Sequence, residues 1–129
     1  MNQSFFFQAV DRNLTQAVDL LSHLIRFPST RGNEQEISRF LKERLDSLVD
    51  RTELIPLPDD LMNDPDYSFR LAEFSYRGTA NLRAVVEGAR GGKSVAFNTH
   101  LDVVPPTVGQ ENAFSPIVKD EKVYGRGAC

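Results

Sequence analysis

The chain has 129 residues, 40% hydrophobic and 26% charged, which suits one compact domain or part of a larger one. Its 15 Lys and Arg residues against 18 Asp and Glu residues leave a net charge of -3, so no basic excess favours binding to nucleic acid or to an anionic membrane. No apolar run reaches the roughly 18 residues of a membrane span, and the single cysteine, Cys129, excludes an internal disulfide framework, so a reducing, cytoplasmic setting is expected.

The first predicted helix begins near Leu14 and ends before Pro28, because proline disfavours a helical residue ahead of it. Asp11 or Asn13 could cap its start. His23 lies on the polar face, where a solvated surface histidine is expected. The apolar positions recur at spacings of three and four, as on one face of a helix: Leu14, Ala17, Val18, Leu21, Leu24 and Ile25.

A second helix is predicted to begin near Asn33. Asn33 with Glu36 three residues later resembles a capping box, in which each side chain bonds a backbone N–H of the first helical turn. The face expected to be exposed to solvent consists of Lys42, Glu43, Arg44 and Asp46. The expected buried face consists of Ile37, Phe40, Leu41, Leu45 and Leu48.

Strands are predicted at residues 51–57, 70–76, 81–87 and 93–99. The last two flank a glycine-rich turn and would form a hairpin or a close connection. Pro105-Pro106 prevents a longer second strand. Two helices followed by strands indicate an α/β or α+β layer fold, with α/β as the class we expect.

Residues 56–67 contain three prolines and four aspartates and are predicted to form a surface loop. The aspartates could suggest a calcium site. They lack the spacing and the central glycine of a calcium-binding loop. A solvated acidic loop is therefore the better interpretation.

The triplet His100-Leu101-Asp102 is the main candidate for chemistry. If strand geometry continues, the two polar side chains project to the same face. The carboxylate could then hold one imidazole nitrogen and leave the other free for a metal. The same pair would also suit a general base. Taken alone, the triplet is equally typical of a hydrogen-bonded histidine at a strand end.

Further motifs extend this pattern along the chain. The run from Val95 to Pro105 is followed by Phe114-Ser115-Pro116 and then by Val-Tyr-Gly-Arg-Gly-Ala-Cys at 123–129. Together they closely resemble the two-zinc peptidases and deacylases, the family of acetylornithine deacetylase, succinyl-diaminopimelate desuccinylase, aminoacylase and glutamate carboxypeptidase. Earlier features of the sequence are similar to this family as well: Leu24-Ile25-Arg26-Phe27-Pro28-Ser29, Gly32, Glu34 and Asn81-Leu82.

The resemblance implies that residues 1–129 are the N-terminal part of a zinc-exopeptidase-like catalytic domain. His100 would be a zinc ligand, and Asp102 would be the catalytic-site carboxylate that orients it. The complete site would hold two zinc ions, with cobalt as a possible substitute, and would hydrolyse amide bonds in N-acyl amino acids or small peptides. The full-length protein is expected to be a cytoplasmic homodimer that binds neither nucleic acid nor membranes.

The family's metal-bridging aspartate would come directly after Cys129. The later ligands, the glutamate pair and the inserted lid or dimerisation domain are likewise absent from these residues. A catalytic zinc site needs about three protein ligands, so the 129 residues alone are expected to be inactive. The alternative is a non-catalytic binding or interaction module that retains half of the fold.

Two other residues leave more than one interpretation open. Arg126 could bind a substrate carboxylate, although a surface role is the simpler interpretation. Cys129 could pair with His100 as a thiol nucleophile, but a small packing residue is favoured because no third orienting group can be assigned. The Gly125-Arg126-Gly127 run does not complete a dinucleotide-binding pattern and indicates a turn.

Overall fold

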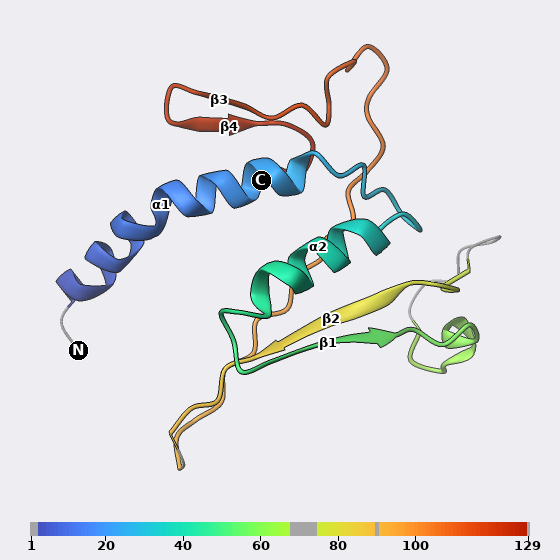
Figure 1. Ribbon diagram of the computed structural model, residues 1–129. Helices are drawn as coiled ribbons and strands as arrows, with labels where there is room; N and C mark the ends of the chain where they lie inside the picture. Colours follow the sequence, from blue (N-terminus) through green and yellow to red (C-terminus); the bar gives the residue numbers. More distant parts are fainter. Residues whose placement is uncertain (1–2, 68–74, 90, 129) are drawn as a thin grey trace. The chain divides into compact units, whose positions relative to one another are not determined.

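The computed structural model describes residues 3–67, 75–89 and 91–128. In chain order these residues form α1 (Gln3–Ile25), α2 (Gln35–Leu45), β1 (Arg51–Pro56), the 3-10 turn η1 (Leu61–Asn63), β2 (Ala80–Val85), β3 (Ile117–Lys119) and β4 (Lys122–Tyr124) (Figure 1). The two helices and the antiparallel strands agree with the expected α/β class. None of the described helices has the length and apolar character needed to cross a membrane.

The chain divides into two compact units. The first unit comprises Met1–Pro28 and Val103–Cys129, and the second comprises Ser29–Asp102.

The second unit consists of an antiparallel ribbon with a helix on it. β1 pairs with β2 in a register that places Leu54 opposite Leu82, so apolar side chains meet across the strands. α2 lies against both strands (Figure 1). At the end of α2, the Asp46 carboxylate accepts a hydrogen bond from the hydroxyl of Thr52 in β1, which connects the helix to the ribbon.

α2 begins at Gln35, two residues after the predicted start, and the predicted capping box is wrong. Glu34 occupies the cap position, and its side chain makes no capping hydrogen bond. Asn33 instead donates to the Thr30 hydroxyl, and Glu34 accepts a bond from the Gly32 N–H. The local turn thus takes up the Asn33 side chain that the predicted capping box would use.

The predicted apolar face of α2 is largely confirmed. Ile37 is buried, whereas Phe40, Leu41 and Leu45 are partly buried. Leu48 is exposed because the helix ends at Leu45, after which the chain turns toward β1. The stripe therefore stops where helical geometry stops.

The four strands predicted from the sequence differ in how they compare with the structure. Those at 51–57 and 81–87 are confirmed as β1 and β2. Most of the strand predicted at 70–76 lies outside the described residues, as does Arg90 in the glycine-rich turn.

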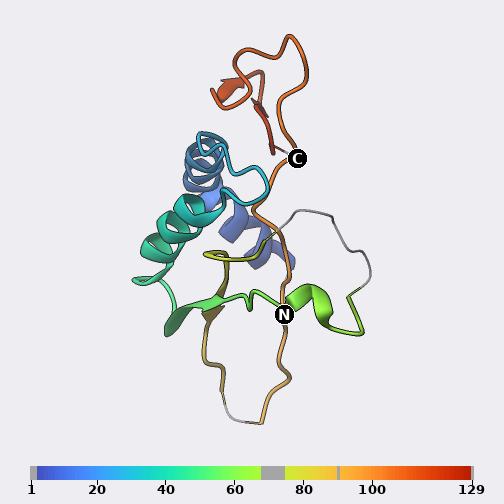
Figure 2. The same cartoon turned by 90° about the vertical axis from the view of Figure 1, so that its right-hand side faces the viewer.

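The strand predicted at residues 93–99 is wrong, and so is its hairpin with residues 81–87. β2 pairs with β1 instead, and residues 92–102 carry no strand (Figure 2). Phe97 is 95% exposed. Alternating apolar residues form a strand only when a neighbouring strand satisfies their backbone groups, and the described residues offer 93–99 no such neighbour.

In the first unit, α1 begins eleven residues before the predicted start. Asp11 and Asn13 are therefore inside the helix rather than at its cap, and Asn13 Nδ2 donates to the Ala9 carbonyl at 2.7 Å. The helix is packed at its C-terminal end, where Ile25 is buried. Large apolar side chains remain exposed toward its N-terminal end: Phe5, Phe6, Phe7, Val10 and Leu14.

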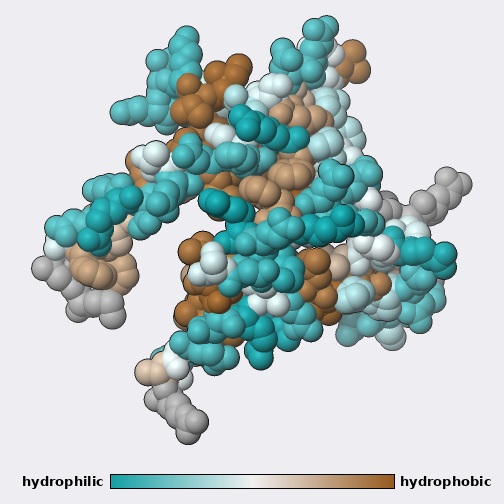
Figure 3. Space-filling view, in the orientation of Figure 1, coloured by the Kyte–Doolittle hydropathy of each residue, from teal (hydrophilic) through white to brown (hydrophobic). Residues whose placement is uncertain are grey.

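The hairpin of β3 and β4 completes the first unit. Its two turn residues, Asp120 and Glu121, have φ values of 52° and 58°. This pair of left-handed residues is typical of a type I′ turn, whose twist matches that of the strands. Ile117 and Val118 in β3 are exposed, and Figure 3 shows apolar side chains on the visible surface.

Candidate functional site

His100 and Asp102 contact one another, although the predicted strand around them is absent. The distance from His100 Nδ1 to Asp102 Oδ1 is 3.2 Å, and Nδ1 lies 2.9 Å from the Asp102 backbone carbonyl oxygen. The imidazole is 82% exposed. The carboxylate and the ring thus have the arrangement that the sequence spacing predicts, produced by an irregular segment instead of a strand.

The contact with the backbone carbonyl determines which ring nitrogen carries the proton. A carbonyl oxygen can only accept a hydrogen bond, so Nδ1 must donate, and a neutral His100 then keeps its lone pair on Nε2. Metal-binding histidines typically donate one ring N–H to a carboxylate or a carbonyl in this way. The chemistry of His100 therefore fits a single metal ligand.

A complete metal centre needs further ligands. Within residues 3–67, 75–89 and 91–128, no three His, Cys, Asp or Glu side chains gather closely enough to hold a metal ion. The ligand role predicted for His100 and the orienting role predicted for Asp102 stay predictions.

Ser29 contacts the His-x-Asp segment, which the sequence did not indicate. In the sequence it is only the last residue of the segment 24–29 that is similar to the two-zinc family. In the structure its Oγ donates a 2.8 Å hydrogen bond to the carbonyl of Leu101, and Ser29 is only 1% exposed. A serine after a proline is too common to single out, and the 72 residues between the two partners hide the contact.

In the first unit, Arg126 holds a turn. Its Nη2 donates to Thr107 Oγ1 at 3.1 Å and also to Gln110 Oε1. Its backbone N–H donates to the Ala113 carbonyl at 2.7 Å. The guanidinium therefore has neutral oxygen partners within the unit, and the substrate contact and the surface role considered from the sequence stay predictions.

Within the first unit, the glycine-rich segment at residues 125–127 closely approaches Val103. A Cβ added at Gly127, whose φ is 83°, would lie 2.7 Å from Val103 Cγ1. Val103 directly follows Asp102 in the chain. The turn expected at Gly125-Arg126-Gly127 is thus associated with a close approach that only glycine allows.

Cys129 and His23 have different outcomes. Cys129 lies outside the described residues, so its predicted packing role and the alternative thiol pair stay predictions. His23 is exposed, as expected, and its Nδ1 lies 2.8 Å from the Asp19 carbonyl oxygen.

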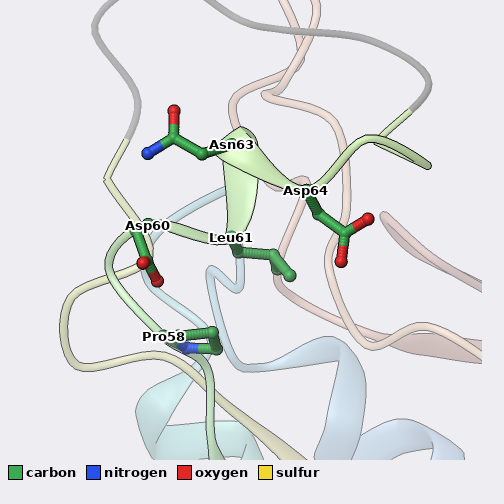
Figure 4. Close-up of a pocket in the computed structure, with 5 residues that line it drawn as sticks. All are labelled: Pro58, Asp60, Leu61, Asn63 and Asp64. Atoms are coloured by element: carbon green, nitrogen blue, oxygen red, sulfur yellow. The ribbon is translucent and has the colours of Figure 1, made fainter.

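The acidic loop forms a shallow hollow of about 280 Å³ lined by Pro58, Asp60, Leu61, Asn63 and Asp64 (Figure 4). The Asp60 and Asp64 carboxylates lie on either side of Leu61 and do not converge. Asp64 Oδ1 instead accepts the Asp66 N–H at 2.9 Å, which is a local turn contact. These contacts agree with the solvated loop predicted from the sequence.

The chain is similar to curated proteins named succinyl-diaminopimelate desuccinylase. It is 33% identical over 122 residues to that of Cupriavidus necator and 34% identical over 115 residues to that of Paraburkholderia xenovorans, which is 90% and 85% of this chain. A shorter match of 49 residues, 37% of this chain, is 53% identical to the protein of Sphingopyxis alaskensis. The matches span 28%, 25% and 13% of these three relatives. No family model and no solved structure matches the chain.

Proposed function

This chain is a relative of the succinyl-diaminopimelate desuccinylases, in a family of peptidases and deacylases, and from this we infer that the protein is a metal-dependent hydrolase of amide bonds. The substrates we propose are N-acyl amino acids or small peptides. The observation that carries the proposal beyond the hydrolase family is the His100–Asp102 contact, because it leaves Nε2 of an exposed imidazole free to bind a metal.

We assign the described residues the following roles. His100 Nε2 is one metal ligand, and Asp102 holds the ring in the tautomer that can bind. Zinc, when bound, supplies a Lewis acid that polarises the scissile carbonyl and lowers the pKa of water to about 7. The other ligands and the proton-accepting carboxylate come from further residues of the protein.

The same proposal covers the architecture. Residues 1–129 form the N-terminal part of a zinc-exopeptidase-like catalytic domain with two metal ions, for which cobalt can substitute. A lid or dimerisation domain is formed by other residues, and the protein acts as a cytoplasmic homodimer.

The test uses the full-length protein, stripped of metal and then supplied with Zn²⁺, and a panel of N-succinyl and N-acetyl amino acids. We expect hydrolysis only with metal, and His100→Ala to reduce kcat/KM by at least about 100-fold. His23→Ala is the matched control, because this second histidine is also exposed, and it should retain activity.

Hydrolysis that needs no metal, or that survives in His100→Ala, would contradict the proposal. A protein that neither binds Zn²⁺ nor cleaves any of these amides would support the alternative, a non-catalytic binding module.

A further inference from the structure

Ser29 anchors the middle of the His-x-Asp motif. Its Oγ donates to the carbonyl of Leu101, the residue between His100 and Asp102, at 2.8 Å. The serine is only 1% exposed, so water has little access to compete for the bond. The hydroxyl therefore fixes the position of this carbonyl.

The anchored carbonyl belongs to the peptide group that leads into Asp102. A peptide group is planar and rigid, so restraining the Leu101 oxygen also restrains the motion of the Asp102 N–H in the same group. Around it, residues 92–102 have no strand ladder to define the backbone direction. The Ser29 hydrogen bond is thus a restraint at the point where the two site residues must face each other.

We propose that Ser29 is a positioning residue for the His100–Asp102 pair, an inference that rests on the proposed hydrolase function. By holding the Leu101 carbonyl, the serine keeps the Asp102 oxygens against His100 Nδ1. The ring then stays in the tautomer whose Nε2 lone pair can bind a divalent metal.

The key variant is Ser29→Ala in the full-length protein, which removes the donor and little volume. Ser38→Ala is the matched control, because Ser38 is a second buried serine of the same unit, at 5% exposure, on α2. Ser29→Cys provides a second variant of similar size with only a weak S–H donor. It serves in place of Ser29→Ala if the alanine variant fails to fold.

The first measurement is Co²⁺ affinity, followed through the visible absorption of the bound ion. We expect Ser29→Ala to raise the Co²⁺ dissociation constant at least fivefold and to lower kcat with little change in KM. Ser38→Ala should stay within twofold of the unchanged protein in all three quantities. Equal effects of the two variants would mean that Ser29 only fills space, and would overturn the proposal.

The second measurement needs neither metal nor activity. In metal-free protein labelled with ¹⁵N-histidine, the His100 ring signals, identified by their loss in His100→Gln, should show the Nδ1–H tautomer. Ser29→Ala should shift them toward a mixture of tautomers, and unchanged signals would overturn the proposal. If the unchanged protein hydrolyses no amide while this shift is seen, the proposed function fails and the positioning role stands.

Discussion

His100 Nδ1 meets two oxygens of one residue, the carboxylate Oδ1 of Asp102 at 3.2 Å and the Asp102 backbone carbonyl oxygen at 2.9 Å. The duplicated acceptor means that the ring keeps one partner even when the carboxylate is altered. It also means that the orientation of His100 depends on the backbone of Asp102 as well as on its side chain.

The first prediction concerns Asp102→Asn in the full-length protein. An asparagine amide can present its NH₂ group to the ring, which favours the tautomer with the proton on Nε2 and opposes metal binding. Because the backbone carbonyl still accepts from Nδ1, we expect the Zn²⁺ affinity to fall by about tenfold, at the lower end for such orienting residues. A competition titration with a chelator measures it.

Asp60→Asn is the control for this charge change, since Asp60 is an exposed aspartate of the acidic loop. It should leave the Zn²⁺ affinity unchanged. Equal losses in both variants would assign the effect to net charge rather than to the contact with His100.

The second prediction concerns the packing of α1 in the first unit. A Cβ on Gly125 would lie 2.5 Å from Ile25 Cγ2 and 3.6 Å from the Ala113 carbonyl oxygen, and both Ile25 and Ala113 are buried. We therefore expect Gly125→Ala to lower the free energy of unfolding by about 1–3 kcal/mol, as measured by urea unfolding.

Gly88→Ala is the matched comparison, because a Cβ there meets nothing within 4 Å. It should change the free energy of unfolding by no more than about 0.5 kcal/mol. Similar losses at Gly125 and Gly88 would show that the clash with Ile25 does not determine the effect.

Local patterns predicted part of this fold well. The spacing of Ile37, Phe40 and Leu41 identified α2 and its packed face, because a helix is stabilised by contacts within a few residues along the chain. Residues 51–57 and 81–87 were also identified as strands. Their pairing with each other was not, because a strand's sequence does not specify its partner.

Other features were missed because their cause is not in the local pattern. Asp120-Glu121 lacks the glycine that normally marks a two-residue hairpin turn, so β3 and β4 were not predicted. At the candidate site, the two-residue spacing predicted the contact of His100 with Asp102. The support from Ser29 comes from 72 residues away and could be found only in the structure.

The third prediction concerns pH. The Thr52 hydroxyl, followed by the Lys42 ammonium, holds the pKa of Asp46 below its ordinary value of 3.8. Because the folded state binds the proton less tightly than the unfolded chain, this contact stabilises the protein above about pH 4, and the stabilisation is lost as the pH falls through the lowered pKa.

Thr52→Val should therefore reduce stability at pH 6, and the difference from the unchanged protein should shrink as the pH falls below 4. Thr52→Ser keeps the hydroxyl and should keep the pH dependence. Urea unfolding at several pH values measures both, and a Thr52→Val effect of constant size across this range would be evidence against the Asp46 contact.

The fourth prediction concerns Arg126 and the turn at residues 107–110. Gln110 Oε1 accepts from the guanidinium and, at 3.3 Å, from the Thr107 N–H, while the Gln110 N–H donates to the Thr107 carbonyl at 2.9 Å. Removing the arginine donor with Arg126→Gln should open this turn more often, so the Gln110 amide should exchange its hydrogen about fivefold faster, the equivalent of one lost hydrogen bond.

Gln110→Glu keeps the acceptor oxygens and should preserve the protection of the Thr107 amide against hydrogen exchange, whereas Gln110→Leu should not. Slow exchange at Gln110 in Arg126→Gln would mean that the turn is stable by itself and that Arg126 merely rests against it.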